Sequence, residues 1–385
     1  MSDDSDLTGW NKFTGTIVDS DGDRLTDLDE KVRYNTDPRN PDTDHDGLQD
    51  GWEIHGVNGI DLAELGASPL HRDVFVEMDY MTRVSATHGL GPGDDVLKRI
   101  VEIFANAPVD NPDGLPGIRL HLELGNQVAY DENLQPLNKE FYALRRDNFQ
   151  SDVRGPVYHY MIWANAYDNG DSSGYSMNIP GSDFVVTLGR WHNNTGGTDD
   201  EKVGTFVHEL GHNLGLRHGS IDDTNRKPNH LSVMNYNFQT SGVSVKGGHV
   251  WGFQTFEMSA LDENALLESD GLQPRSATIA DYETMWRVLS GASRRGTAGG
   301  PLDWTGNKKI DTGKVQVDLN GDGKNTLLDK TINEWIALKY LIGTIGSREK
   351  RFKLRELAEK NFVVQPVEEL TEAQDQIIKA SLAPP

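Results

Sequence analysis

Eleven residues, His208-Glu-Leu-Gly-His212-Asn-Leu-Gly-Leu-Arg-His218, constrain this 385-residue chain more than any other segment. Residues 199–214 predict a helix, because apolar side chains recur there at helical spacing. These apolar positions are Val203, Phe206, Val207, Leu210 and Leu214. Residues four positions apart share one face of a helix, so His208 and His212 project together, away from the apolar face. Gly215 permits a left-handed turn after the helix, which lets His218 turn back toward the same point.

Three imidazoles at this spacing predict a catalytic zinc site. Three protein ligands leave one tetrahedral position for water, whereas a structural zinc has four protein ligands. Glu209 neighbours a ligand but points about 100° away around the helix. It can therefore take a proton from the activated water without binding the metal. We expect His208, His212 and His218 to bind zinc and Glu209 to act as the general base. The alternatives are three unrelated surface histidines, or a site that binds zinc without catalysis.

The segment resembles the zinc-binding motif of the metzincin clan of metalloproteases, in which a methionine-containing turn follows. Ser232-Val-Met234-Asn-Tyr236 is similar to that turn, and Met234 comes 16 residues after His218. The resemblance implies that Met234 lies beneath the zinc as a hydrophobic base without binding it. It also implies that Tyr236 corresponds to the tyrosine that in some metzincins binds zinc or stabilises the oxyanion. The alternative is a structural tyrosine.

The resemblance covers residues 70–292 and implies an α+β catalytic domain. Its upper part would be a twisted mixed sheet with two helices, and its lower part, after Gly219, would be smaller and irregular. The residue pattern predicts strands at 74–78, 118–124, 157–164 and 183–188, a surface loop at 168–182, and helices at 94–107 and 278–290. An extended substrate would pair with an edge strand, for which 183–188 is the candidate. Gly219 leaves the subfamily within the clan open.

An acidic repeat spans residues 19–53, and its two copies are offset by 23 residues. Alternate side chains of a tight 12-residue loop converge on one point, and Ca²⁺ takes six to eight oxygen ligands. The candidate ligands are Asp19, Asp21, Asp23, Asp27 and Glu30 in the first copy, and Asp42, Asp44, Asp46, Asp50 and Glu53 in the second. Gly47 stands at the sharp bend of the second copy. Arg24 replaces it in the first copy, where we expect a weaker or distorted site.

The two copies, with Asn-Thr-Asp-Pro between them, resemble thrombospondin type 3 repeats, which their calcium ions hold together. The alternative is a solvated acidic linker. A third loop has the candidate ligands Asp318, Asn320, Asp322, Lys324 (through its carbonyl) and Asp329. This loop resembles the EF-hand loops of dockerins, and a helix containing Trp335 is expected after it. Dockerins have two such loops and only one is visible here, so a structural calcium site is the prediction.

Composition limits the partners of the chain. It has 37 Lys and Arg against 60 Asp and Glu, a formal net charge of −23. This balance argues against nucleic acid and against an anionic membrane surface as partners. The chain has no cysteine, which excludes disulfides and cysteine-based zinc sites. It also lacks an apolar run of about 18 residues, so no transmembrane helix is expected.

We expect four parts: a flexible arm at 1–18, calcium repeats at 19–69, a zinc protease domain at 70–292, and a helical region with one calcium loop at 293–385. A Gly/Ser/Arg-rich linker is expected at 290–300. The predicted protein is a monomeric zinc-dependent endopeptidase that holds about three calcium ions and cleaves extended protein or peptide substrates.

An extracellular location is expected, because millimolar Ca²⁺ outside cells suits weak calcium modules. The acidic residues 1–6 do not read as a signal peptide. Two alternatives to a secreted protease therefore stay open: a catalytically silent adhesion protein of the same fold, and a protease effector delivered without a leader. A further hypothesis is latency, in which residues 1–69 cover the cleft and Asp3 or Asp6 takes the open zinc position.

Overall fold

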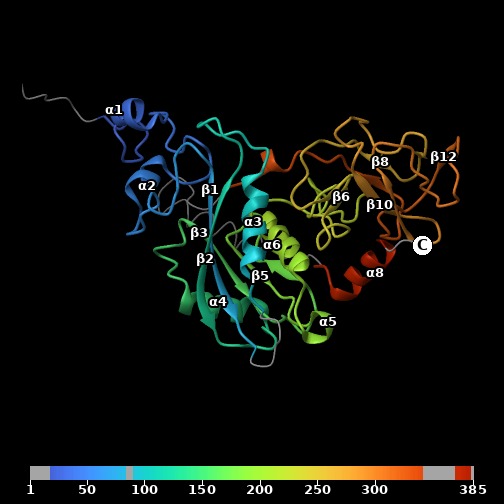
Figure 1. The fold of residues 1–385 in the computed structure, drawn as a ribbon, viewed down its shortest axis with the longest axis horizontal. Coiled ribbons are helices and arrows are strands. Elements are labelled where there is room, and N and C mark those ends of the chain that lie inside the picture. Colours follow the sequence, from blue (N-terminus) through green and yellow to red (C-terminus); the bar gives the residue numbers. More distant parts are fainter. Residues whose placement is uncertain (1–17, 84–89, 341–368, 383–385) are drawn as a thin grey trace, which may run out of the picture.

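The computed structural model describes residues 18–83, 90–340 and 369–382. The fold is α+β, with a five-stranded, mostly parallel sheet and helices packed against it (Figure 1). The strand order is β2-β1-β3-β5-β4, and β4 alone runs antiparallel to its neighbour in this sheet. The five strands are β1 (Asp73–Met81), β2 (Arg119–Val128), β3 (Tyr158–Trp163), β4 (Gly174–Ser176) and β5 (Asp183–Val186).

Strand β1 is buried along both faces because each face of the sheet has its own core. Three helices cover the sheet: α3 (Asp94–Ala105), α4 (Leu137–Asn148) and α6 (Asp199–Asn213). Val76 and Met78 of β1 belong to the core shared with α3 and α6, whereas Phe75 belongs to the core shared with α4. This alternation is the period of a strand. The predicted strands and the helices expected at 94–107 and 199–214 are confirmed.

Two predictions about the sheet are wrong: that 183–188 is an edge strand, and that 168–182 is a surface loop. The edge strand next to α6 is β4, because β5 lies between β3 and β4. The stretch 168–182, expected to be a surface loop, contains this edge strand. Three residues, Gly-Tyr-Ser, are too few for an alternating pattern, and glycine and serine carry no strand preference. Pairing with β5, rather than local sequence, makes this segment a strand.

The chain after α6 consists mainly of short strand pairs. The short helix α5 (Trp191–Asn194) precedes α6. The elements described after α6 are β6 (Val243–Val245), β7 (Gly248–Val250), β8 (Leu261–Asp262), β9 (Leu266–Leu267), β10 (Glu283–Arg287), β11 (Ser293–Thr297), β12 (Lys314–Val315), β13 (Leu327–Leu328), the 3₁₀ turn η2 (Trp335–Ala337) and α8 (Glu372–Leu382). The pairs are β6–β7, β8–β13, β9–β12 and β10–β11.

The hairpin β10–β11 corrects two predictions. The helix expected at 278–290 is wrong, because 283–287 form β10. The linker expected at 290–300 is also wrong, because 293–297 form β11, antiparallel to β10. A short apolar run fits a strand as well as a buried helix, and pairing with β11 makes residues 283–287 a strand. The domain limit expected at 292/293 falls in the turn of this hairpin, and the helix expected around Trp335 is a single 3₁₀ turn.

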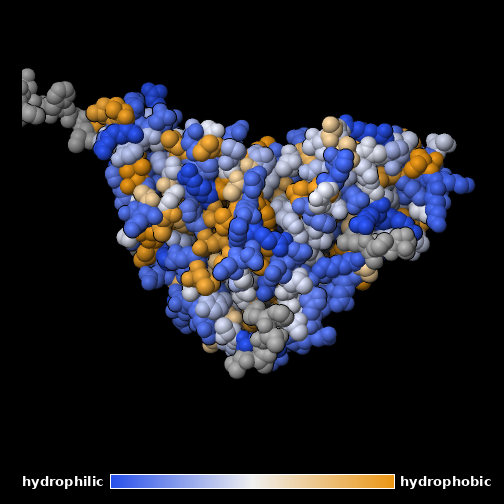
Figure 2. All heavy atoms as spheres, in the orientation of Figure 1, coloured by the Kyte–Doolittle hydropathy of each residue, from blue (hydrophilic) through white to orange (hydrophobic). Residues whose placement is uncertain are grey.

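The acidic repeats form α1 (Asp27–Asp29), the π-helical turn η1 (Glu30–Tyr34) and α2 (Asp50–His55) at one end of the sheet (Figure 1). Leu48, Val57 and Leu62 from this region join the core on the α4 side of the sheet. Most of the predicted arm, residues 1–17, lies outside the described residues. The face in Figure 2 is mainly hydrophilic, with apolar atoms in separate patches. Among the described residues no helix has the length and apolarity needed to span a membrane.

Candidate metal centre

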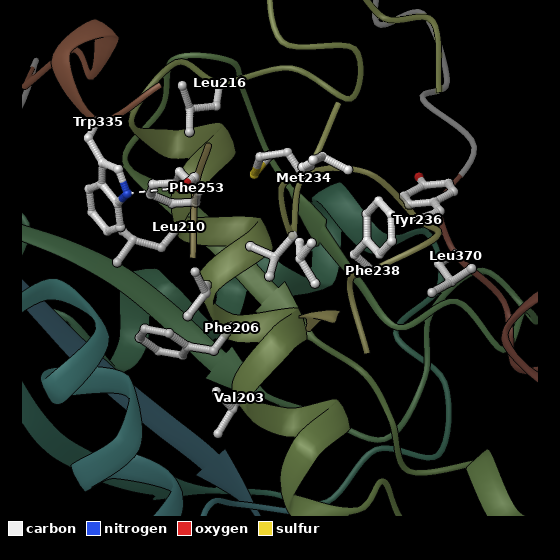
Figure 3. Packing of buried hydrophobic residues seen from close by; sticks show 14 of the residues in the cluster. Val203, Phe206, Leu210, Leu216, Met234, Tyr236, Phe238, Phe253, Trp335 and Leu370 are labelled. Atoms are coloured by element: carbon white, nitrogen blue, oxygen red, sulfur yellow. Dashed lines mark hydrogen bonds between the residues drawn. The ribbon is translucent and has the colours of Figure 1, made fainter. Parts of the chain in front are cut away.

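Helix α6 begins with a capping box and ends in a left-handed turn. The side chain of Thr198 accepts a hydrogen bond from the backbone of Glu201, whose carboxylate accepts one from the backbone of Thr198. The five predicted core residues, four in α6 and Leu214 directly after it, are fully buried. Figure 3 shows three of them, Val203, Phe206 and Leu210. Gly215 has φ +91°. The predicted exit from the helix is therefore confirmed.

The three predicted histidines meet at one point and are buried. The Nε2 atom of His212 lies 3.1 Å from that of His208 and 3.0 Å from that of His218. The remaining pair, His208 and His218, is separated by 3.2 Å. A tetrahedral ion with metal–nitrogen bonds of about 2.0 Å sets roughly 3.3 Å between two ligands. The spacing of the three nitrogen atoms therefore fits one small cation.

Hydrogen bonds determine which ring nitrogen of two histidines faces this point. Nδ1 of His208 lies 2.9 Å from the carbonyl oxygen of Val233, and Nδ1 of His212 lies 2.8 Å from that of Leu216. A carbonyl only accepts, so each Nδ1 carries the proton and each Nε2 presents a lone pair. Burial lowers the pKa of both rings to about 4, which keeps them neutral near pH 7. Lone pairs that face each other at this distance repel, and a cation bound between them removes this repulsion.

A fourth side chain, Glu369, reaches the same point. Its Oε2 lies 3.7 Å from Nε2 of His208 and 3.8 Å from Nε2 of His218. The same carboxylate oxygen accepts a hydrogen bond of 3.0 Å from the hydroxyl of Tyr236. Glu369 was not predicted from the sequence, because it lies far from the motif along the chain and no spacing rule connects the two.

Glu209 lies beside the centre, buried, and neither carboxylate oxygen has a hydrogen-bond partner among the described residues. Burial first, and then the charge of Glu369, raise the pKa of Glu209 well above its usual value. A Cβ atom at Gly174 of β4 would lie 2.6 Å from Oε1 of Glu209 and 2.7 Å from the carbonyl oxygen of Val185. The edge strand therefore leaves room for Glu209 only because residue 174 is a glycine.

Met234 and Tyr236 both pack against the histidine cluster. A Cβ atom at Gly211 would lie 2.5 Å from Sδ of Met234, so the thioether touches α6 between two of the histidines. Figure 3 shows Met234 in this apolar core. The ring of Tyr236 lies 4.7 Å from that of His218, measured between centroids. Burial and the neighbouring Glu369 raise the pKa of Tyr236 well above its usual value.

His230 supports the third histidine from behind. Its Nδ1 lies 2.8 Å from the carbonyl oxygen of His218, and its Nε2 lies 2.7 Å from Oε1 of Glu334. Both side chains are fully buried. The other oxygen of Glu334 accepts a hydrogen bond from the backbone of Gln254. Glu334 lies in the segment expected to be a helix, and its contact with His230 was not predicted.

In the first acidic loop the structure brings Asp19, Asp21 and Asp23 together. Glu30 is buried beside them, and burial and the charges of Asp21 and Asp23 raise its pKa to about 7. Arg24 adopts φ +83°, close to the +92° of Gly47 in the second loop. The two loops therefore share one bend, and Arg24 adopts a left-handed conformation that costs free energy for any residue with a side chain.

The second loop gathers two overlapping groups of carboxylates: Asp42, Asp44 and Asp46, and then Asp46, Glu53 and Asp73. Both oxygens of Glu53 are buried without a partner among the described residues. Burial and the charges of Asp46, Asp44 and Asp73 raise the pKa of Glu53 well above its usual value. Asp73 is the first residue of β1 and lies outside the 12-residue template, so sequence spacing gave no sign of it.

Three predicted ligands of these two loops lie outside these groups: Asp27, Glu30 and Asp50. The carboxylate of Asp27 accepts hydrogen bonds of 2.9 Å from both the backbone and the hydroxyl of Ser20. That of Asp50 accepts them from the backbone and hydroxyl of Thr43, at 2.8 and 2.6 Å. The ninth position of each loop therefore ties the end of the loop to its beginning.

The third loop is held mainly by its own backbone. Asp318 accepts hydrogen bonds from the backbone of Gly321, Asp322 and Gly323. The backbone of Lys324 donates to Asp322 at 2.9 Å, and the side chain of Asn320 donates to Asp322 at 3.4 Å. Asp329 is exposed, and its carbonyl oxygen accepts from Lys227 and Asn229. Among the described residues, its three carboxylates, those of Asp318, Asp322 and Asp329, do not form a cluster.

A further loop of the same form, residues 303–311, precedes the third loop and was not predicted from the sequence. The side chain of Asp303 accepts from the backbone of Gly306 and Lys308. Buried Glu268 accepts from the backbone of Thr305 and Asp311, as buried Glu263 does from Leu319 and Thr326 in the third loop. The regular Asp303-x-Thr-x-Asn spacing was a usable signal, although it contains one acidic residue where Asp318-x-Asn-x-Asp contains two.

No protein-family model and no curated protein matches this chain. One solved structure with some similarity is described as "Structure of a chaperone-substrate complex". Its TM-score is 0.29 at 15% identity, over 48% of this chain and 29% of that chain. This chain therefore covers less than a third of that chain, and a likeness of this size carries no argument about fold or function.

Proposed function

We propose that this chain is a zinc-dependent endopeptidase of the metzincin type. The observation that carries the proposal is the convergence of Nε2 of His208, His212 and His218 beside the buried, unpartnered carboxylate of Glu209. The donor set, three neutral imidazoles, suits zinc. When bound, zinc would polarise the scissile carbonyl and lower the pKa of a water to about 7.

The remaining steps belong to residues of this chain. Glu209 accepts the proton of the attacking water and returns it to the leaving nitrogen. Tyr236, beside His218, donates to the oxyanion once its hydroxyl is released from Glu369. An extended substrate adds to the outer edge of β4, whose Gly174 touches Glu209.

Calcium belongs to the same proposal. Several buried carboxylates come together at the second loop, those of Asp42, Asp44, Asp46, Glu53 and Asp73. Buried charges of one sign are unfavourable without a counterion. Oxygen-only ligands suit Ca²⁺, and about three ions are expected along the chain. Asp73 would connect the second calcium loop directly to β1. Because Ca²⁺ is abundant outside cells, calcium sites of this kind favour an extracellular location. The proposed protein is a monomer that acts on protein or peptide substrates.

The test is hydrolysis of casein by the full-length protein with one zinc per chain and calcium present. We expect hydrolysis, by this protein or by its Glu369→Gln variant, that stops on addition of 1,10-phenanthroline and returns with zinc. Because Glu369 lies at the centre, Glu369→Gln is assayed in parallel. If neither protein hydrolyses casein or a peptide library while both hold one zinc, the endopeptidase proposal is wrong. The catalytically silent adhesion protein would then be favoured.

Gly174→Ala is expected to lower kcat about 10- to 100-fold, because misplacement of a catalytic group by about 1 Å costs this much. The new methyl group would push Glu209 away from its present place. Zinc content is expected to stay at one per chain, because no histidine moves. Gly170→Ala in the same loop is the control, since a Cβ atom there would meet nothing nearer than 3.6 Å. Equal kcat values for the two variants would contradict the assigned role of Gly174.

A further inference from the structure

The segment after Glu369 pairs with the edge strand next to the metal centre. The backbone of Ser173 donates a hydrogen bond of 2.8 Å to the carbonyl oxygen of Leu370. Ser172 and Thr371 form an antiparallel bridge. Leu370 is fully buried in the main core, where Figure 3 shows it with Tyr236. Residues 369–371 therefore extend the sheet at the start of β4, on the edge available to an extended substrate.

Helix α8 fastens this segment to the rest of the molecule. Glu372 accepts a hydrogen bond of 2.9 Å from the backbone of His192. Lys379 pairs with Glu201, the buried residue of the α6 capping box, and Asp375 accepts a hydrogen bond from Thr240. Figure 1 shows α8 beside the β10–β11 region, and the two elements are in contact. These contacts hold Glu369 close to the histidines.

We propose that Glu369 is a fourth protein ligand of the metal and that residues 369–371 occupy the place of substrate, so that the chain is latent until this segment is displaced. The proposal rests on the proposed function only for the identity of the metal and for the substrate site. Four protein ligands leave no tetrahedral position for water, which is the arrangement of a structural zinc.

The geometry separates Glu369 from an ordinary neighbour of the site. Its Oε2 lies within 4 Å of two ligand nitrogens, and the hydroxyl of Tyr236 holds that oxygen in place. Because the segment belongs to the same chain, it competes with substrate at a high effective concentration. Tyr236 cannot serve an oxyanion while its hydroxyl donates to Glu369. Displacing one segment would thus free the metal position, the strand edge and the phenol together.

The test compares the full-length protein with Glu369→Gln, which keeps the size of the side chain and removes its charge. Both proteins are loaded with Co²⁺ in place of zinc, so that visible absorption reports the ligand set. Acetohydroxamic acid, which needs an open metal position, is then titrated into each. We expect a changed absorption spectrum in Glu369→Gln and at least tenfold tighter hydroxamate binding. Glu102→Gln, at an exposed position of α3, is the control and is expected to match the parent.

Three results decide the proposal. If Glu369→Gln has the parent spectrum and the parent hydroxamate affinity, Glu369 is not a ligand and the proposal is wrong, whether or not the protein cleaves peptides. If both properties change and casein hydrolysis rises at least tenfold, ligand and latency are both supported. If both change in a parent that already cleaves casein, and the rate does not rise, latency is refuted. Lack of hydrolysis in every variant would refute the peptidase proposal while the cobalt spectra still report the ligand.

Discussion

Glu209→Gln is expected to lose peptide hydrolysis and to become more stable than the parent protein. Loss of a general base costs about 10²- to 10⁴-fold in rate. The gain in stability arises because the carboxylate is buried without a partner among the described residues and lies near a second carboxylate, Glu369. A neutral amide of the same size removes the unfavourable charge, which we expect to be worth about 1–3 kcal/mol in the zinc-free protein.

The pH dependence of this gain has a definite sign. Glu209 has a higher pKa in the folded than in the unfolded state, so the folded state of the parent binds more protons. Its stability is retained below the unfolded pKa of about 4.3 and falls as the pH rises above that value. The advantage of Glu209→Gln is therefore expected to be small near pH 4 and to grow toward neutral pH.

Urea unfolding with calcium present, after removal of zinc by 1,10-phenanthroline, measures this difference. Glu102→Gln serves as the control, because its carboxylate is exposed and its removal is expected to leave the rate unchanged and to alter stability little. If the Glu209→Gln protein keeps more than a tenth of the parent rate of hydrolysis, Glu209 is not the general base. A variant less stable than the parent at pH 7 would show that favourable interactions offset the cost of burying the Glu209 carboxylate.

Local sequence predicted the part of the centre that is local in the chain. The apolar period of α6, the spacing of His208 and His212, and the turn at Gly215 all act within one short segment, and each is confirmed in the fold. Four of the five sheet strands were also predicted, because a long apolar or alternating run indicates a strand from local sequence alone.

The features that were missed depend on contacts that no local pattern encodes. Glu369 and Asp73 reach their clusters through tertiary packing, so no spacing rule could include them. Strand β4 exists because β5 pairs with it, and β10 is a strand because β11 pairs with it. The assignment of Asp27 and Asp50 as ligands came from a 12-residue template. In the structure these carboxylates accept hydrogen bonds from Ser20 and Thr43 at the start of their own loops.

Withdrawal of calcium is expected to unfold the acidic repeats while α6 and the main core stay folded. Residues 19–53 contribute few apolar side chains to the core, chiefly Leu25 and Leu48, so the ions supply much of their stability. An ion at 1,000 times its dissociation constant contributes about 4 kcal/mol. Dialysis against calcium-free buffer should make this region cleavable by trypsin, at Arg24, Arg33 or Arg39, and returned calcium should protect it.

Glu53→Gln is expected to imitate this withdrawal at the second loop. Its buried carboxylate lies among Asp46 and Asp73, and an amide there offers the ion one neutral oxygen in place of a charged pair. The calcium concentration that protects the repeat is expected to rise about tenfold or more. Glu64→Gln, an exposed position in the same region, is the control. Equal calcium requirements in the two variants would place Glu53 outside the ion's ligands.

The pH dependence of the repeats should change sign with calcium. Without the ion, burial and neighbouring carboxylates raise the pKa of Asp44 to about 8 and those of Glu30 and Asp50 to about 7. The folded repeat then binds more protons than the unfolded chain, so its stability falls as the pH rises from 4 to 8. With saturating calcium the carboxylates are held ionised and protons compete with the ion, so stability rises over the same interval. Hydrogen exchange of residues 19–53, measured at several pH values with and without calcium, gives both slopes. Two slopes of the same sign would show that these carboxylates do not share a cation.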